Sequence, residues 1–329
     1  MLRVTWRGIV VNVGNGSAML RNVYILSAGR SGSTLTSLIL GSHPNAVSVG
    51  ELFHLPKNLA LNTACACGTP IRNCRFWQPV IRTVSERLGL DIASDPYSLD
   101  LGFIGATNVF DTKHQTKFYR AIWKARHALM RFQMQTGARI PRAVEQRFAT
   151  GITNTLVVYD AIRRVSHSDV IVDSSKGYLR GIAMYQRHPD TTRLLLLSRD
   201  GRGRFFSGLR SGHSRRSIVD GWRKYYEHAL PLLEKHVPAN HWLPVHYEDL
   251  ARDPASETRR ICNFLGLAFD PVMLDFRRKE SHVANGNDMR LQDSRQIVFD
   301  TAWQRELTGD DLEFFEQRGG SMNRRLGYT

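Results

Sequence analysis

Short apolar runs recur along the chain, and each is followed by a turn or capping residue and then by a helical pattern. Four runs have the length and the aliphatic composition of buried parallel strands. They are VYIL, DVIVD, RLLLLS and HWLPVHYE, so we expect core strands near residues 23–28, 169–173, 193–198 and 241–248. Strands that alternate with helices need right-handed crossovers, which predicts a doubly wound α/β fold around a parallel sheet.

The helical patterns complete this organisation. After the first run, Leu35, Leu38 and Ile39 share one face of a segment that ends near Gly41. Residues from about 111 to 167 are mostly helical in pattern, and we interpret them as a helical insertion that could shape a binding pocket. The sequence has no internal repeat, low-complexity segment or Pro-, Gly- or Ser-rich linker, so one domain over residues 1–329 is the simplest partition.

Composition narrows the class of protein. The hydrophobic fraction of 42% and the charged fraction of 23% are those of a folded globular chain, which argues against disordered, collagen-like and coiled-coil proteins. No apolar run approaches the roughly 20 residues that a membrane span needs. The N-terminal segment lacks the apolar stretch and the cleavage site of a signal peptide, so we expect a cytoplasmic protein; secretion with a lost leader is the alternative.

The charge is strongly basic. Lysine and arginine number 45 against 30 acidic residues, which gives a net charge of +15. This excess favours encounters with anions such as phosphorylated cofactors, nucleic acid, acidic polysaccharides or anionic lipid, although a solvated basic surface explains it equally. A Lys-rich tract and an aromatic-interleaved basic repeat are both missing, so we expect no specific nucleic-acid partner.

Three of the four cysteines lie together in CACGTPIRNC, at Cys65, Cys67 and Cys74, while Cys262 stands apart. The cluster suggests a thiolate zinc site, but a fourth ligand nearby is missing, and His54 could complete it only by folding back. A disulfide is the second interpretation, disfavoured in a reducing compartment. A structural loop without metal is the default, and these alternatives stay open.

The segment VYILSAGRSGSTLTSLILGSHP carries the first candidate chemistry. A buried strand runs into a loop and then into a helix; the loop residues are Gly29, Arg30, Ser31, Gly32, Ser33 and Thr34. Glycines let the backbone curl close to an anion, which the free N–H groups and the positive end of the helix dipole then face. The pattern predicts a phosphate or sulfate site.

A nucleotide triphosphatase would carry a lysine after the second glycine of its loop, to span the terminal phosphates. Here Gly32 is followed by Ser33 and Thr34, and the cation of the loop is Arg30, two residues earlier. Such a loop fits a donor with a single transferable group and no bridging metal ion, so we expect no metal ligand in this site.

A second anion motif occurs in RLLLLSRDGRGRFFSGLRSG. Arg199 follows a strand at its carboxyl end, and Ser207 comes eight residues later in the next helix. Ligands of open α/β sheets bind beyond these strand ends, so both side chains could contact one phosphate.

The two motifs together resemble those of sulfotransferases that use 3′-phosphoadenosine 5′-phosphosulfate (PAPS). The first is similar to their 5′-phosphosulfate loop, closest to the tyrosylprotein and bacterial branch, and the second to their 3′-phosphate motif. The resemblance runs from about Val23 to the C-terminus, but only these motifs are specific. It implies a P-loop-like three-layer domain with a central, mostly parallel sheet, and PAPS bound by residues 29–34, Arg199 and Ser207.

The resemblance also implies catalytic residues. Glu51 fits the position of a general base, which would help remove the proton from a poorly nucleophilic acceptor hydroxyl. Lys176, in VIVDSSKGYLRG, fits a lysine that stabilises the charge developing on the bridging phosphate oxygen, and Arg30 would share this role. Asp173 is expected to orient neighbouring groups. A solvated loop glutamate and an exposed surface lysine are the alternatives.

The C-terminal part matches less well. SHVANGNDMR, which contains Gly286 and Arg290, is similar to the C-terminal cosubstrate loop of the bacterial branch, and Arg290 is a candidate for binding the cosubstrate. The Arg-Lys-Gly triplet of cytosolic relatives is absent, because residues 277–280 lack the glycine. Which C-terminal residues contact the 3′-phosphate therefore stays open.

The sequence thus predicts a sulfotransferase that moves a sulfuryl group from PAPS to an acceptor hydroxyl by in-line displacement, with no metal required. The acceptor is open between a carbohydrate, a lipid, a small metabolite and a peptide tyrosine, and a homodimer is left open. Two alternatives are a Mg²⁺-dependent nucleotide or sugar kinase with an altered P-loop, and a non-catalytic polyanion-binding protein.

Overall fold

A five-stranded sheet forms the centre of the described structure. The computed structural model describes residues 21–101, 117–292 and 296–329, so the first 20 residues of the expected domain and residues 111–116 of the expected insertion lie outside it. The strands are β1 (Arg21–Ser27), β2 (Ala46–Gly50), β3 (Val170–Lys176), β4 (Thr192–Ser198) and β5 (Trp242–His246). Their order is β2-β3-β1-β4-β5, and every neighbouring pair is parallel. The predicted α/β fold with a parallel sheet is confirmed.

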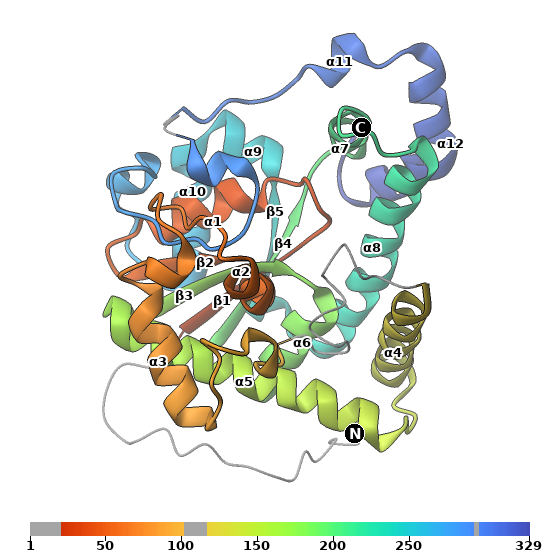
Figure 1. The fold of residues 1–329 in the computed structure, drawn as a ribbon. Coiled ribbons are helices and arrows are strands. Elements are labelled where there is room, and N and C mark those ends of the chain that lie inside the picture. Colours follow the sequence, from red (N-terminus) through yellow and green to blue (C-terminus); the bar gives the residue numbers. More distant parts are fainter. Residues whose placement is uncertain (1–20, 102–116, 293–295) are drawn as a thin grey trace.

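Helices connect these strands and cover both faces of the sheet (Figure 1). The α-helices are α1 (Ser33–Gly41), α2 (Leu55–Leu61), α3 (Trp77–Leu88), α4 (Lys117–Thr136), α5 (Arg142–Ser166), α6 (Tyr178–Arg187), α7 (Gly201–Leu209), α8 (Arg215–His236), α9 (Tyr247–Arg252), α10 (Pro254–Leu265), α11 (Trp303–Glu306) and α12 (Gly309–Arg325). The short 3₁₀ turns are η1 (Leu52–His54), η2 (Ile71–Asn73), η3 (Pro96–Ser98), η5 (Ala239–His241), η6 (Pro271–Leu274) and η7 (Asp288–Leu291).

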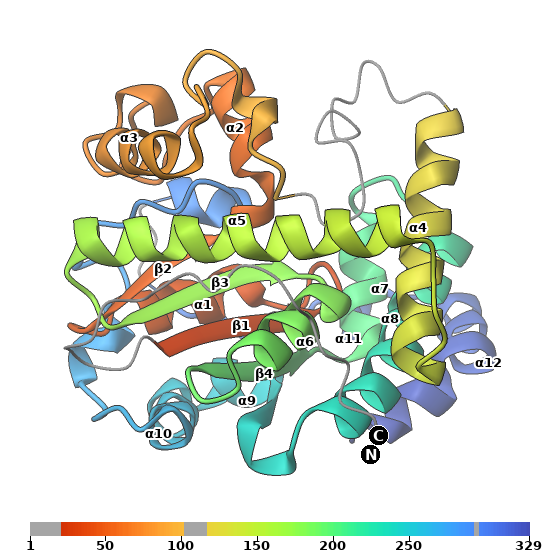
Figure 2. The same ribbon diagram turned by 90° about the horizontal axis from the view of Figure 1, so that it is seen from below.

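Alternating side chains of the strands build two hydrophobic layers. Val23 and Ile25 of β1 pack with buried residues of α1, α9 and α10 on one face. Tyr24 and Leu26 belong to the other layer, with α5, α6 and α8. Figure 2 shows α5 lying along the strands on this side. Because residues i and i+2 of a strand face the same way, a sheet covered on both sides needs apolar residues at every position, which explains the continuous apolar runs.

The strand register brings the candidate residues to one edge of the sheet. β1 lies between β3 and β4, with Leu26 opposite Lys176 and Ser27 opposite Leu197. The glycine loop, Lys176 and Arg199 therefore follow neighbouring carboxyl ends, the edge where open α/β sheets bind ligands.

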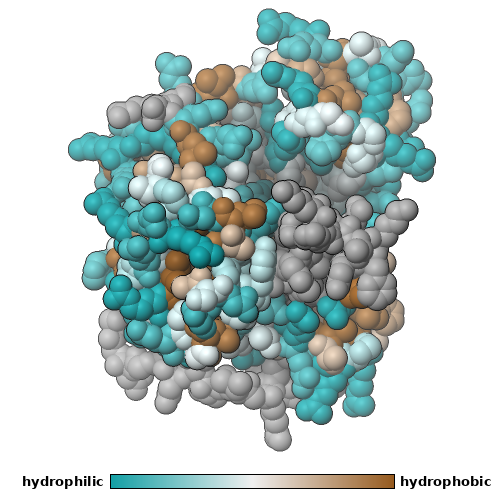
Figure 3. Space-filling model, viewed as in Figure 1, coloured by the Kyte–Doolittle hydropathy of each residue, from teal (hydrophilic) through white to brown (hydrophobic). Residues whose placement is uncertain are grey.

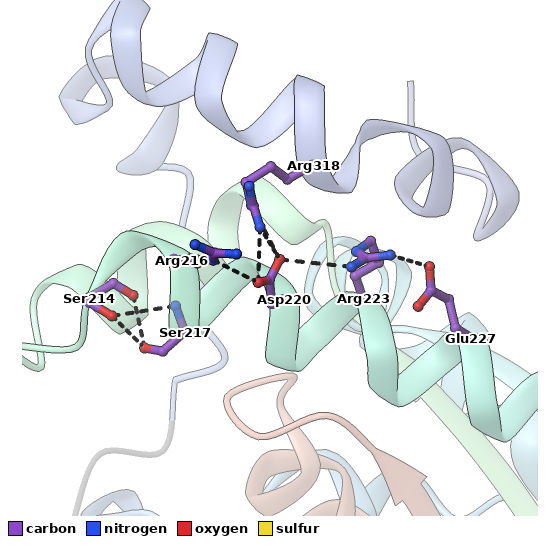
Figure 4. A network of polar contacts seen from close by, with 7 residues as sticks. All are labelled: Ser214, Arg216, Ser217, Asp220, Arg223, Glu227 and Arg318. Atoms are coloured by element: carbon purple, nitrogen blue, oxygen red, sulfur yellow. Dashed lines mark hydrogen bonds and ion pairs between the residues drawn. The ribbon is translucent and has the colours of Figure 1, made fainter.

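An ion-pair network joins the C-terminal helix α12 to α8 (Figure 4). The guanidinium of Arg318 donates to both carboxylate oxygens of Asp220 at 3.0 Å, and it lowers the pKa of that carboxyl. Arg216 and Arg223 approach the same carboxylate at 3.5 and 3.8 Å, and Arg223 also donates to Glu227. The network fixes α12 against α8, whose Tyr226 hydroxyl accepts from the amide of Ala28, just before the glycine loop, at 3.4 Å.

The visible surface is largely polar. Figure 3 shows hydrophilic residues over most of this face, with hydrophobic residues scattered in small groups. Among the described residues, no helix is both long and apolar enough to cross a bilayer.

Candidate active site

The glycine loop makes a tight turn between β1 and α1. Arg30 has φ 66° and Gly32, the residue that caps α1, has φ 88°, so both lie in the left-handed region. A residue with a Cβ is disfavoured there by roughly 1–2 kcal/mol, so Arg30 is held in a strained conformation that the surrounding structure enforces. At Gly32 a Cβ would also lie 2.5 Å from Cδ2 of Tyr247, which leaves room only for glycine.

The second anion motif packs against this loop. Nη1 of Arg30 donates to the hydroxyl of Ser207 at 3.4 Å, although the residues are 177 positions apart. Ser207 and Arg204 both lie in α7, and Nε of Arg204 donates to the carbonyl oxygen of Gly29 at 3.4 Å. Burial lowers the pKa of Arg204 to about 10, and the nearby charge of Arg30 adds to this shift. Helix α7 thus brings two further polar groups to the loop.

Arg199 lies over the ring of the tyrosine that packs on the loop. Its guanidinium lies 4.6 Å from the ring centroid of Tyr247, the residue that packs on Gly32. Nη2 of Arg199 pairs with Asp300 at 3.2 Å, and the arginine side chain is only 9% exposed. The buried cation is therefore positioned on two sides, by an aromatic face and by a carboxylate.

A carboxylate and an ammonium group meet at the neighbouring strand end. Lys176, the last residue of β3, forms an ion pair with Glu51, which directly follows β2. Nε2 of His54 lies 3.6 Å from the second oxygen of Glu51, and burial lowers the pKa of this histidine. Lys176 has φ 69°, a second strained cation at this edge of the sheet.

Asp173 organises the end of β3. Its buried carboxylate accepts hydrogen bonds from the hydroxyl of Tyr159 and from the amide and hydroxyl of Ser175. The Ser175 hydroxyl in turn accepts from the amide of Phe53 at 3.1 Å, in the turn that follows Glu51. Burial raises the pKa of Asp173. This network orients the segments that carry Glu51 and Lys176.

These groups together can hold an anion beside an acid–base pair. Arg30, Arg199 and Lys176 follow or end adjacent strands, and the N-terminus of α1 adds its partial positive charge. The Glu51 carboxylate is the nearest acidic partner of Lys176 in this cluster.

The comparisons with known proteins identify the family. A model of the sulfotransferase family matches residues 105–271, just over half of the chain. The chain belongs to the sulfotransferase family. Among curated proteins, none matches this sequence closely enough to count as a relative.

Solved sulfotransferase structures share the fold. The sulfotransferase domain of the olefin synthase from Synechococcus PCC 7002 has a TM-score of 0.50 and 20% identity over 92% of this chain and 96% of that one. The sulfotransferase domain of the curacin biosynthetic pathway has a TM-score of 0.50 and 16% identity over 95% of this chain and 99% of that one. The sulfotransferase STF9 from Mycobacterium avium has a TM-score of 0.51 and 14% identity over 95% of this chain and 78% of that one. At these identities the likeness concerns the fold.

The segment after α10, residues 281–290, contacts both the glycine loop and the backbone of Glu51. The amide of Asn287 donates to the Thr34 hydroxyl at 3.1 Å, and the carbonyl of Asn285 accepts from the amide of Glu51 at 3.2 Å. Arg290, from the same segment, donates instead to the carbonyl of Ala64 at 2.7 Å, so its guanidinium is held by the cysteine loop. The sequence pointed to Arg290 but not to the two asparagines, which flank Gly286.

Tyr247 is a second residue that the sequence did not reveal. The sequence predicted a strand over 241–248, but β5 ends at His246. Tyr247 is therefore the first residue of α9 and not part of the strand. Its ring touches both anion motifs of the sulfotransferase, as described above. An aromatic residue directly after a strand, at the ligand-binding edge, was the available signal.

The cysteine cluster of this sulfotransferase has a fourth member that the sequence did not reveal. Ligand atoms of Cys65, Cys67, Cys74 and His282 all lie within 4.8 Å of one another. His54, the candidate fourth ligand in the sequence, contacts Glu51 instead. All four cysteines, Cys262 included, lie in the described part of the chain, and none of them forms a disulfide.

Proposed function

We propose that this sulfotransferase transfers a sulfuryl group from PAPS to the hydroxyl of an acceptor by in-line displacement, without a metal ion at the reacting centre. One observation carries the proposal: the two anion motifs meet. Arg30 of the first donates to Ser207 of the second, and Gly32 and Arg199 lie against the same tyrosine ring. A single nucleotide with phosphates at both ends suits such a pair of adjoining cationic sites.

For the cosubstrate we assign the following contacts. The loop from Gly29 through Ser31 and Ser33 to Thr34 would hold the 5′-phosphosulfate at the positive end of α1. Arg199 and Ser207 would hold the 3′-phosphate, for which a buried guanidinium is a strong partner. Arg290 would support binding through the segment after α10, since it anchors the stretch that reaches Thr34.

For the transfer we assign three roles. Glu51 takes the proton of the acceptor hydroxyl while the oxygen of that hydroxyl attacks the sulfur of PAPS. The bond from sulfur to the 5′-phosphate oxygen breaks, and 3′-phosphoadenosine 5′-phosphate (PAP) departs with the electron pair. Lys176 and Arg30 stabilise the negative charge on that oxygen. Positioning and charge stabilisation supply the catalysis, so the step needs no metal ion.

The acceptor site lies, in our proposal, beside Tyr178, two residues after Lys176. The centroid of the Tyr178 ring lies 5.7 Å from that of His127 in α4 and 5.5 Å from that of Tyr225 in α8. Helix α4 belongs to the segment expected to shape a pocket. These aromatic rings would give the acceptor an apolar contact beside the transfer site, and the acceptor is left open between a carbohydrate, a lipid, a small metabolite and a tyrosine residue.

A thermal-shift comparison tests the proposal. PAP at 100 times its Kd should stabilise the protein by about 2.7 kcal/mol, and ADP, which lacks the 3′-phosphate, by much less. Arg199→Ala should remove most of the PAP shift, whereas Arg324→Ala, an exposed arginine on α12, should keep it.

Other outcomes would contradict the proposal. Equal stabilisation by ADP, together with Mg²⁺-dependent ATP consumption, would indicate a kinase. Salt-sensitive binding of heparin that survives Arg199→Ala, with no effect of PAP on the melting temperature, would indicate a polyanion-binding protein.

A further inference from the structure

Three cysteine sulfurs and one imidazole nitrogen converge at a point away from the transfer chemistry. Cys65, Cys67 and Cys74 come from the loop between α2 and α3, and His282 comes from the segment after α10. Cys74 and His282 are 208 positions apart in sequence, so only the fold brings this fourth group to the cluster.

The spacing of these atoms is that of ligands around one small ion. Sγ of Cys74 lies 3.7 Å from Sγ of Cys65, 3.6 Å from Sγ of Cys67 and 3.4 Å from Nδ1 of His282. Sγ of Cys65 is 3.9 Å from the same nitrogen. With zinc bonds of about 2.3 Å to sulfur and about 2.0 Å to nitrogen, tetrahedral geometry separates sulfurs by about 3.8 Å and sulfur from nitrogen by about 3.5 Å.

A disulfide does not account for this arrangement. Sulfur atoms in a disulfide are about 2.05 Å apart, well below the two measured separations. Cys74 is also nearly equidistant from two cysteines and points to a histidine nitrogen, a set of partners that one disulfide cannot satisfy. Cys65 and Cys74 are fully buried, whereas Cys67 and His282 are partly exposed.

The surroundings fix the imidazole in the required orientation. The ring of His282 stacks on Phe76 with a centroid distance of 4.8 Å, and its carbonyl accepts from the indole of Trp77 at 2.8 Å. Nε2, the nitrogen that faces away from the sulfurs, lies 3.7 Å from a carboxylate oxygen of Glu280. This separation exceeds hydrogen-bond length, and the same carboxylate pairs with Arg75, but it lies beside the outer nitrogen, where metal-binding histidines usually have a carboxylate or carbonyl partner.

The backbone of the cysteine loop is folded to present its sulfurs. The amide of Cys65 donates to the carbonyl of Thr69, and the amide of Gly68 donates back to the carbonyl of Cys65, both at 2.9 Å. Gly68 has φ 85°, a conformation that favours glycine, and this closes the turn between Cys65 and Cys74.

We propose that Cys65, Cys67, Cys74 and His282 bind one zinc ion as a closed structural site. Three thiolates and one imidazole in tetrahedral arrangement are a ligand set that favours zinc. The protein fills all four positions, so the ion has no open place for a reactant and is separate from the metal-free transfer proposed above.

The zinc would hold the segment after α10 against the active site. The amide of Ala66 donates to the carbonyl of Val283 at 3.1 Å, next to His282. Two residues further on, Asn285 accepts from Glu51, and Asn287 donates to Thr34. This consequence rests on the proposed function of Glu51 and Thr34, whereas the metal site itself does not.

Metal analysis of the purified protein tests the site directly. The protein is isolated without chelators under reducing conditions, and its metals are measured by inductively coupled plasma mass spectrometry. We expect about one zinc per chain, and X-ray absorption of the same sample should give three sulfur neighbours and one nitrogen neighbour at the distances above. Cys262→Ala should keep the zinc, whereas Cys74→Ser and His282→Ala should lose most of it.

Several results would overturn the site. They are less than about 0.2 zinc per chain even after incubation with zinc and reductant, a zinc shell dominated by oxygen, iron in place of zinc, or a disulfide among the three cysteines in protein kept reduced. Since X-ray absorption uses the unmodified protein, unfolding of a variant would not obscure the answer. Zinc content is independent of turnover, so failure of the proposed sulfotransfer would be recognised separately.

Discussion

The ammonium group of Lys176 forms an ion pair with the carboxylate of Glu51, across 125 positions of sequence. Each side chain is only 19% exposed, so neither is a solvated surface residue. In our proposal the two groups act on opposite sides of one sulfuryl transfer, at the attacking and the leaving oxygen. They neutralise each other until substrates enter, and the reaction requires the acceptor hydroxyl to take the place of Lys176 at the carboxylate.

Replacing the proposed base gives the first prediction. Glu51→Gln keeps the size of the side chain but cannot accept a proton, so kcat should fall by roughly 10²–10⁴-fold. The Kd for PAP, measured by calorimetry, should change little. Glu234→Gln, an exposed residue of α8, is the matched control and should retain parental turnover. Near-normal turnover of a folded Glu51→Gln protein would contradict the assignment.

Replacing the proposed leaving-group cation gives the second prediction. Lys176→Met keeps the apolar stem and removes the charge, so kcat should fall by roughly 10²–10³-fold. Because both residues serve one step, the double variant Glu51→Gln/Lys176→Met should lose less than the product of the two single losses. Lys224→Met, an exposed lysine of α8, is the control. A change confined to KM would show that Lys176 acts only in binding.

The sheet could be predicted from the sequence only in part. Four apolar runs correspond to β1, β3, β4 and β5, because strands buried on both faces are apolar at consecutive positions. The edge strand β2, AVSVG, was not predicted. It has five residues, two of them Ser48 and Gly50, and its burial comes from α1 and the segment after α10, which local pattern does not reveal.

Some residues of the candidate site could also be predicted from the sequence, and others could not. The glycine loop could be recognised because its backbone demands and its order are local, as the positive φ of Gly32 illustrates. Tyr247, Asn287 and His282 could not, because each acts through a contact with a residue more than 200 positions away. Sequence records order along the chain, whereas these contacts depend on which strand ends and loops the fold places side by side.

A pair of glycine substitutions gives the third prediction. Gly32→Ala places a Cβ 2.5 Å from the Tyr247 ring and at φ 88°, so it should destabilise the protein by at least about 1 kcal/mol. It should also abolish the PAP-induced thermal shift, because Tyr247 would be displaced from Arg199. Gly29→Ala meets no atom within 4 Å and is the control for stability. Equal melting temperatures of the two variants without ligand would contradict the packing described for Gly32.

The fourth prediction concerns stability at acid pH. His127 is largely buried against Trp123 and Tyr178, and this burial, helped by the charge of Arg131, lowers its pKa to about 4 from the usual 6.5. Below pH 6.5 the unfolded chain therefore binds a proton that the folded chain does not. The stability contributed by neutral His127 is complete above pH 6.5 and is lost as the pH falls toward 4.

Urea unfolding at pH 7 and pH 5 measures this effect. The linkage relation gives a loss of about 2 kcal/mol from His127 between these pH values. His127→Gln, which does not titrate, should reduce the difference in unfolding free energy between pH 7 and pH 5 by that amount. Part of the difference should remain, because burial also lowers the pKa of other histidines such as His228. His228→Gln also removes a histidine whose pKa burial lowers, so it should flatten the profile in the same direction. An unchanged difference between pH 7 and pH 5 in His127→Gln would show that this imidazole is not held neutral by the fold.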